Sequence, residues 1–209
     1  MAKAGQLTTI PRLPRPGEGA VVEIARRQIS KPDGSTGLEL GIDLSLAPVP
    51  ERRYVADVAG LTYEDDVLQM FFGQRKITKS GTLRSLIVIQ MTSTAGRQFI
   101  KTLGGFEPGF RKWLTENGIA RQLTCIEEEP EQTVTLFANM IGLAFAGREA
   151  CVDYYHASPF SLHQVKQNKK MAVEPVVRVI LSSGLLLSII DKLHEFETVF
   201  PKEQGLSDE

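Results

Sequence analysis

Two stretches of the chain share one pattern of small, apolar and aromatic residues. Residues 54–73 are YVADVAGLTYEDDVLQMFFG, and residues 136–156 are LFANMIGLAFAGREACVDYYH. The shared positions are an alanine, a glycine, a leucine and, after one inserted residue, an aromatic pair: Ala56 with Ala138, Gly60 with Gly142, Leu61 with Leu143, and Phe71–Phe72 with Tyr154–Tyr155. Because a period of about 85 residues is too long for a solenoid repeat, the match indicates a duplication.

The match continues through a further strand into a helix. Residues 87–106 align with residues 177–196, so that Leu103 falls on Leu193. Each half then has the order strand, strand, loop, strand, helix, inferred from apolar residues at period two and then at helical spacing. The first strand is expected over residues 52–61 in one half and over residues 133–145 in the other. Alternating apolar residues are common to all β-β-β-α stretches, and this is the other explanation of the match. The shared glycines favour duplication, because a glycine inside a strand has a positional reason such as a bulge or close packing.

The two helices have signals at their ends and on their apolar faces. The first is expected to have Ser93 or Thr94 as its N-cap, to break between Gly104 and Pro108, and to end before Gly118. The second follows an apolar strand, and its apolar residues fall on one face: Leu186, Ile189, Ile190, Leu193 and Phe196. Such faces predict helices that pack against a sheet.

The chain divides into four segments. Residues 1–19 hold three prolines with basic residues between them and are expected to form a flexible arm. Residues 20–121 are expected to contain a hairpin around the turn KPDGS, over about residues 20 to 46, and the first β-β-β-α unit. Residues 122–200 contain the second unit, and 201–209 are a polar tail. Two such units packing helices on antiparallel sheet predict one pseudo-twofold α+β domain.

A motif of four parts runs through the second half: an aromatic-Ala-Asn start, an Asp-aromatic strand, an Arg-Val strand and a helix. The residues that form it are Phe137, Ala138, Asn139, Asp153, Tyr154, Arg178 and Val179. This motif resembles a family of short bacterial proteins of unknown function, which implies a bacterial protein and supplies no activity to carry over. In the first half Asp57 replaces Asn139, and Met70 replaces Asp153. The order of elements is also similar to that of SecB-type export chaperones.

The composition favours an ordinary globular chain in a reducing compartment. The net charge is -1, and 42% of the 209 residues are hydrophobic, which argues against a globally basic nucleic-acid binder. Cys125 and Cys151 do not form a C-x-x-C pair, so neither a disulfide scaffold nor a structural zinc site is expected. The longest apolar run, residues 184–190, is far short of the roughly 20 residues that span a bilayer. Without a secretory signal pattern, the chain is expected to be cytoplasmic and to have no membrane partner.

The sequence contains no clear catalytic constellation. A metal site would have to be built from Cys151, Asp153, His156 and His163, but the first two share a strand face that His156 does not. The acidic runs YEDD and EEEPE fit a turn and a solvated connector, with a paired-acid site as the other interpretation. Nucleotide-binding glycine motifs are lacking. We therefore predict a protein that is not an enzyme and that holds no metal or cofactor.

Two loops in equivalent places of the two units carry basic charge and no acid. They contribute Arg75, Lys76, Lys79 and Arg84 in the first unit, and Lys166, Lys169 and Lys170 in the second. Basic loops in a nearly neutral chain predict an anionic partner, either nucleic acid or an acidic protein surface. The other interpretation is that these loops carry lysine for solubility. The loops lack interleaved aromatic residues, which weakens a single-strand-binding interpretation.

These observations together predict a non-catalytic protein-binding module, acting as an adaptor, a chaperone-like factor or a structural subunit of a bacterial multiprotein assembly. Sheet edges pair readily with other chains, and a proline-rich arm can order on a partner. The alternative is a nucleic-acid-associated factor that binds through the two basic loops. The oligomeric state stays open, because a duplicated chain can mimic a homodimer.

Overall fold

The chain folds into two sets of strands, each followed by a long helix, as the sequence predicts, but two predicted strands are each divided in two and one short helix was not predicted. The computed structural model describes residues 20–30, 34, 36–44, 47–76, 83–122, 130–164, 170–198 and 200, so the predicted arm and tail lie outside the described residues. The described elements are β1 (Ala20–Ser30), β2 (Thr36–Asp43), β3 (Arg53–Val55), β4 (Val58–Glu64), β5 (Val67–Arg75), β6 (Leu83–Thr92), α1 (Ser93–Glu116), β7 (Gln132–Phe137), β8 (Met140–Ala146), β9 (Glu149–His156), α2 (Pro159–Gln164), β10 (Lys170–Ser182) and α3 (Ser183–Glu197). This confirms the α+β class.

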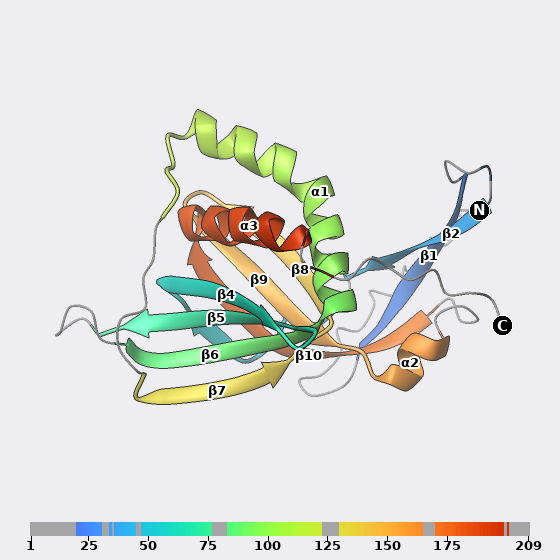
Figure 1. The fold of residues 1–209 in the computed structure, drawn as a ribbon, viewed down its shortest axis with the longest axis horizontal. Coiled ribbons are helices and arrows are strands. Elements are labelled where there is room, and N and C mark those ends of the chain that lie inside the picture. The colour runs from blue at the N-terminus through green and yellow to red at the C-terminus, as the bar shows by residue number, and fades with distance from the viewer. Residues whose placement is uncertain are drawn as a thin grey trace, which may run out of the picture.

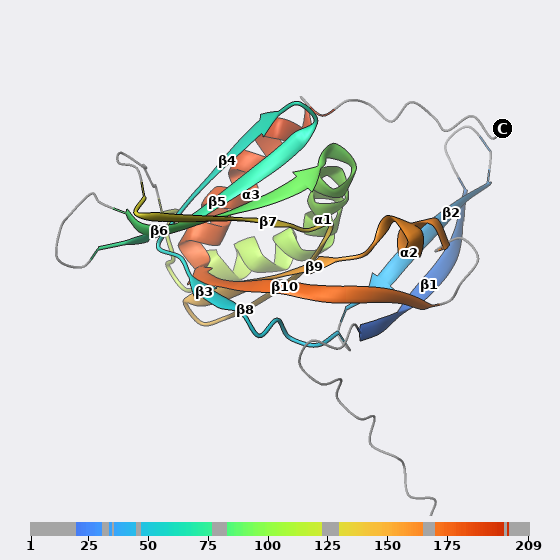
Figure 2. The ribbon, with the colours of Figure 1, turned by 90° about the horizontal axis from the view of Figure 1, so that it is seen from below.

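The strands form two sheets, and α1 and α3 pack against the inner faces of both (Figure 1, Figure 2). One sheet has the order β2-β1-β10-β9-β8, with β3 also paired to β10, and the other has the order β4-β5-β6-β7. Both sheets and both helices contribute to one core, in which Phe72, Tyr154, Leu103 and Leu193 are completely buried. The two predicted units therefore fold around a common core.

The N-terminal hairpin extends the six-stranded sheet. β1 and β2 pair antiparallel over the predicted region, with Ser30 opposite Thr36 at the turn. The start of β1 pairs with the start of β10, where Ala20 lies opposite Val173. Because β10 is 13 residues long, its first half holds this hairpin and its second half holds β9 and β3.

Each unit contributes one strand to the sheet of the other unit. β3 pairs in parallel with β10, and β7 pairs in parallel with β6. Val55 lies opposite Ile180 in the first pair, and Phe137 lies opposite Gln90 in the second. In the sequence match Val55 is equivalent to Phe137, and Ile180 is equivalent to Gln90. The two exchanged strands therefore pair with the other unit in the same register. This agreement supports the predicted duplication, which stays an interpretation.

A short bend links each exchanged strand to the hairpin of its own unit. The sequence predicted one continuous strand over residues 52–61 and another over residues 133–145, and both predictions are wrong. Each is two strands that belong to different sheets. At the bends Ala56 and Ala138 donate their backbone N–H groups to carbonyls of β10 and β6, at 2.8 and 3.1 Å. Both alanines are buried, which explains why a small residue recurs there.

The residue after each alanine anchors the bend with its side chain. The carboxylate of Asp57 accepts the backbone N–H of Arg75 at 3.0 and 3.2 Å. The amide of Asn139 accepts the N–H of Ala157 at 2.8 Å and donates to its carbonyl at 2.7 Å. Asp57 and Asn139, which differ between the two halves of the sequence, thus hold equivalent backbone positions.

The two hairpins align without the inserted residue that the sequence match required. Ala59 lies opposite Phe72, and Ile141 lies opposite Tyr154. Both hairpins close with a turn of two residues, so the two ladders run in the same register from the bend onward. Phe72 is therefore the equivalent of Tyr154, and the predicted alignment of the aromatic pairs is wrong by one position.

Phe72 and Tyr154 also meet each other in the core. Their ring centroids are 6.0 Å apart, and the Tyr154 hydroxyl lies 3.5 Å from the sulfur of Met70. If the two units are related by duplication, a residue contacts its own equivalent only close to the axis that relates them, so this contact agrees with the predicted pseudo-twofold arrangement. In the corrected register the equivalent of Met70 is Val152, not Asp153.

Helix α1 is one continuous helix that contains Pro108, so the predicted break is wrong. Proline removes one hydrogen-bond donor and bends a helix, and the helix continues where packing holds both sides. Leu103 and Phe110, before and after the proline, are completely buried, and Figure 1 shows α1 bending along its length. The N-cap is Thr92, one residue before the predicted position. Gly118 has a φ of 62°, as predicted for the residue that follows the helix.

Charged side chains join the two helices. Arg111 of α1 donates to Asp191 of α3 at 2.5 Å, and Nε2 of His194 lies 2.6 Å from Glu107. Arg111 also pairs with Glu107, and Arg121 lies 3.6 Å from Asp191. Burial alone would raise the pKa of Glu107, but hydrogen bonds with His194 and Arg111 hold that pKa below its ordinary value. The network fixes the position of α1 on α3.

Candidate functional site: the edge strand β7

The described members of the set of basic residues predicted to bind an anionic partner lie in two separate regions. The described ones are Arg75, Lys76, Arg84 and Lys170, whereas Lys79, Lys166 and Lys169 lie outside the described residues. The first three stand where β5 ends and β6 begins, and Lys170 opens β10; Figure 1 places these ends on opposite sides of the molecule. Lys76 forms an ion pair with Glu131, and Lys170 lies opposite Glu23. The structure does not join these four residues in one surface.

Titratable groups gather on the outer face of the six-stranded sheet. Cys151, Asp153 and Tyr155 alternate along β9, and both carboxylate oxygens of Asp153 accept hydrogen bonds from Arg178 at 2.6 Å. Burial raises the pKa of the Cys151 thiol and raises that of Tyr155 to about 12, so neither is prepared to act as a nucleophile or base near neutral pH. Within the described ranges, no three His, Cys, Asp or Glu side chains gather as a metal site.

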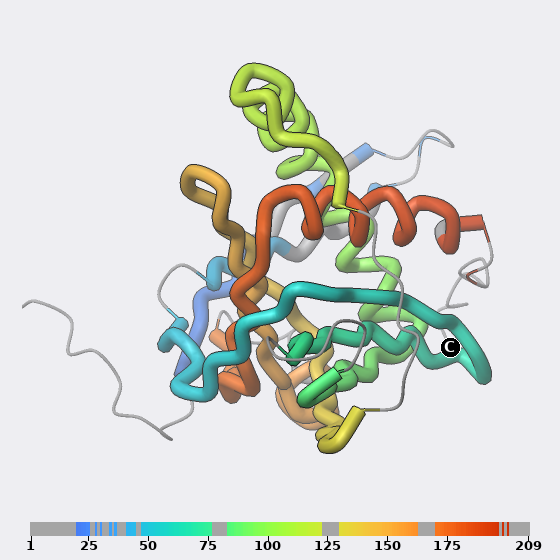
Figure 3. The backbone as a smooth tube through the Cα atoms, turned by 90° about the vertical axis from the view of Figure 1, so that its left-hand side faces the viewer, coloured from blue at the N-terminus to red at the C-terminus, as the bar shows by residue number. Residues whose placement is uncertain are grey.

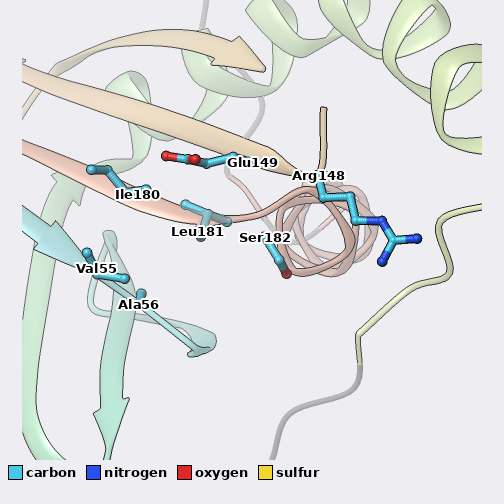
Figure 4. A pocket seen from close by; sticks show the side chains of 7 residues that line it. All are labelled: Val55, Ala56, Arg148, Glu149, Ile180, Leu181 and Ser182. Atoms are coloured by element: carbon cyan, nitrogen blue, oxygen red, sulfur yellow. The ribbon is translucent and has the colours of Figure 1, made fainter. Parts of the chain in front are cut away.

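The surface depressions are shallow. One, of about 390 Å³, is lined by Val55, Ala56, Arg148, Glu149, Ile180, Leu181 and Ser182 (Figure 4). Figure 4 shows the guanidinium of Arg148 pointing away from Val55 and Ala56. A second, of about 250 Å³, is lined partly by Gln122 and Ser188, whose side chains already hydrogen-bond to protein groups. A small-molecule site needs polar groups that converge in a concave pocket, and these depressions lack that arrangement.

Strand β7 is an edge of the four-stranded sheet. Its sequence, QTVTLF, has neither charge nor proline, and Val134 and Phe137 are 47% and 65% exposed. Natural proteins protect edge strands with charge, proline, bulges or covering elements, because an open ladder pairs with other chains. β7 pairs with β6 without a register shift, and the described strands supply no partner for its other side. Within the part of the chain that the structure describes, β7 is therefore an open edge without those protections.

The backbone groups of β7 face alternately toward β6 and away from it. The N–H of Ala138 donates to the carbonyl of Gln90 in β6 at 3.1 Å. The next N–H, of Asn139, points to the other side and donates to the carbonyl of Tyr155 in β9 at 3.0 Å. Because these directions alternate along a strand, Thr133, Thr135 and Phe137 direct their N–H and C=O groups away from β6. These three residues offer a row of donors and acceptors to an added strand.

The other sheet edges carry charge or pack against a helix. β4 ends with Glu64 and packs against α3, and the sequence of β2 includes Glu39 and Asp43. β8 is uncharged like β7, but Phe145 of β8 lies beneath aromatic rings of α1 at centroid distances of 4.9 to 5.4 Å. Those rings belong to Phe106, Phe110 and Trp113. β7 thus stands apart from the other uncharged edge.

Sequence reasoning did not single out β7, because it joined residues 132–137 to the strand that follows. One signal was present, since the chain has no charged residue from Gln132 to Ala146. An uncharged run of that length predicts burial or an interface. Which part of it lies at an open edge depends on the exchange of strands between the units, and that requires the fold.

Comparisons of this chain with family models, with curated proteins and with solved structures find no match. The resemblances to a bacterial family and to SecB-type chaperones therefore stay predictions. None of the described helices is long and apolar enough to cross a membrane.

Proposed function

We propose that this chain is a non-catalytic protein-binding module that receives an extended strand of another polypeptide at the free edge of β7. The observation that carries the proposal is the open, uncharged edge, with Val134 and Phe137 exposed on its two faces. In this role the chain serves as an adaptor or structural subunit of a multiprotein assembly. The half-buried free thiol of Cys151 supports a reducing, cytoplasmic setting.

Strand addition would supply both affinity and selectivity at this edge. Thr133, Thr135 and Phe137 each offer one donor and one acceptor, and every net hydrogen bond contributes about 0.5–1.5 kcal/mol. Covering the side chains of Val134 and Phe137 adds roughly 25 cal/mol for each Å² of apolar surface removed from water. An added strand with apolar residues at alternate positions would gain both terms.

The nucleic-acid alternative has weaker support from the geometry. Nucleic-acid binding needs several cations on one surface, because each neutralised phosphate adds to affinity. The four described residues of the two predicted basic loops lie at two ends of the molecule, and Lys76 is already paired with Glu131. A binding role through the backbone of β7 requires no such charge.

A proline at position 135 tests the proposal. Thr135→Pro removes an N–H that points away from β6 and places a ring at the free edge, so the ladder with β6 keeps its own hydrogen bonds. The matched control, Thr135→Val, keeps the N–H and removes the side-chain hydroxyl. Tagged full-length chains are used to capture partners from lysate of the source organism at high salt, followed by mass spectrometry.

We expect the unsubstituted chain and Thr135→Val to retain the same polypeptide, and Thr135→Pro to lose it while its circular dichroism spectrum is unchanged. Retention of that polypeptide by the folded Thr135→Pro chain would show that β7 is not the binding edge. Loss of retention in rising salt, with no effect of the proline, would favour the nucleic-acid alternative.

A further inference from the structure

We infer that the strand received by β7 is β7 of a second copy of this chain, paired antiparallel about a twofold axis that passes through Thr135. The inference rests on the proposed function and names its partner. In such a pairing each residue of one strand faces a residue of the same strand in the other copy. The strand must therefore complement itself, and β7 does.

The backbone directions limit the registers that a twofold pair can take. Residues that face each other in an antiparallel ladder must both point toward the partner or both point away. Thr133, Thr135 and Phe137 point away from β6 and therefore toward a partner, as the opposite directions of the Ala138 and Asn139 N–H groups establish. A register centred on Thr135 satisfies this condition and uses the whole length of the strand.

Side chains in this register also match. Thr135 would face its own copy, Thr133 would face Phe137, and Val134 would face Leu136. The first two pairs lie on the outer face of the sheet and the third on the inner face, because opposite residues share a face. β-branched and aromatic residues are favourable cross-strand neighbours, and every pair is free of charge.

Charge separates β7 from the other exposed edges as a strand that can meet itself. A charged residue near the centre of a twofold strand pair would face its own copy or a nearby like charge, which destabilises the pair. β2 carries Glu39 near its centre, the three-residue β3 begins with Arg53, and β4 ends with Glu64. The remaining edge, β8, is uncharged but packs beneath aromatic rings of α1. In β7 the nearest charged neighbour along the chain is Glu131, which already pairs with Lys76.

The position of β7 leaves room for a second copy. Figure 1 and Figure 3 both show β7 at the periphery of the molecule, with no described element beyond its free edge. Pairing there would join two four-stranded sheets into one continuous sheet of two copies. A strand pair buries less area than a standard interface of about 1,600 Å², so we expect a reversible dimer with a dissociation constant on the order of micromolar.

Opposite charges at position 135 test this arrangement. Thr135→Lys and Thr135→Glu each place like charges face to face, so each variant alone should dimerise roughly tenfold more weakly than the unsubstituted chain. An equimolar mixture places opposite charges face to face and should recover the original dimerisation. Sedimentation velocity of the full-length chains measures all four samples. A mixture that stays as weak as the single variants, or an unsubstituted chain that is monomeric up to about 1 mM, would overturn the inference.

Cysteine cross-linking tests the register independently. In the proposed pair the two copies of position 135 have Cα atoms about 5.5 Å apart, within disulfide range, so Thr135→Cys should form a covalent dimer under oxidation. The two copies of position 133 would be about 14 Å apart, so Thr133→Cys should not. Equal cross-linking of both variants would refute the register. If the chain is monomeric and a different protein is still lost from Thr135→Pro, the second-copy inference fails and the proposed function stands.

Discussion

Gly184 lies in the first turn of α3, beside residues 117–122, the connector that follows α1. Replacing Gly184 with alanine tests whether this connector is docked on α3. An added Cβ would lie 2.4 Å from the carbonyl oxygen of Ala120 and 3.5 Å from the backbone nitrogen of Gln122. The connector is anchored there, because Gln122 donates its N–H to the Gly184 carbonyl at 3.1 Å and accepts from Ser182 and Ser188 at 2.6 and 2.5 Å. The clash is with backbone, so no side-chain rotation relieves it.

The magnitude follows from those contacts. Reaching an ordinary separation requires a shift of about 1 Å, which would strain or break two or three hydrogen bonds worth about 1 kcal/mol each. The higher helix propensity of alanine returns less than about 1 kcal/mol. We therefore expect Gly184→Ala to lower the free energy of unfolding by about 1–3 kcal/mol and to lower the Tm by about 3–10 °C for a chain of this size.

Gly105→Ala provides the matched control. Gly105 lies in α1, and an added Cβ would have no neighbour within 4 Å, so alanine there should stabilise the chain by about 0.5–1 kcal/mol through helix propensity alone. Urea unfolding followed by circular dichroism measures both variants. If Gly184→Ala stabilises the chain as much as Gly105→Ala does, the docking of the connector on α3 is refuted.

Three further substitutions test the core, the outer face and the helix contact. Gly73→Ala would place a Cβ 2.5 Å from a methyl group of buried Val58, so it should lower the free energy of unfolding by about 1–3 kcal/mol, as measured in urea. Adding Val58→Ala should recover part of this loss, whereas additive losses would contradict the contact. Arg178→Met leaves the Asp153 carboxylate without its bidentate partner and should lower the free energy of unfolding by about 2–4 kcal/mol. The double variant Arg178→Met with Asp153→Leu should be near the original stability. An equal loss in both variants would contradict this account. Hydrogen bonds lower the pKa of Glu107 despite its burial, so its carboxylate contributes stability above about pH 4.5 that is lost as pH falls through the folded-state pKa. Glu107→Gln should therefore flatten the acid side of a curve of unfolding free energy against pH. An unchanged slope would refute the contribution.

The glycines used to infer the repeat do not have the structural role that was expected of them. The repeat was supported by Gly60 and Gly142, for which a bulge or close packing was expected. The ladders are continuous at both, and a Cβ at Gly60 would have no neighbour within 4 Å. Gly73 and Gly184, which drew no attention, are the positions where a side chain does not fit. Tertiary neighbours decide this requirement, and they are far apart in sequence.

Local signals predicted local structure well. The pairing of the two strands that flank KPDGS, the apolar face of α3 and the glycine after α1 are all found, because each depends on residues close in sequence. The bends at Ala56 and Ala138 were missed, since alternation of apolar residues continues through a strand that changes sheets. Side chains alternate with a period of two residues in either sheet, so the apolar pattern is the same whether or not the chain changes sheets.

The differences between the two units indicate where function lies. Asp57 and Asn139 are chemically different but hold the same bend, so this difference carries no separate role. The exchanged strands differ in length and in charge: β3 has three residues and includes Arg53, whereas β7 has six residues without charge. Folding of a pseudo-twofold core requires both strands to pair with the other unit, and three residues suffice for that. The additional length and neutrality of β7 exceed what the core requires, and pairing with another chain is the physical use that an open, neutral edge supports.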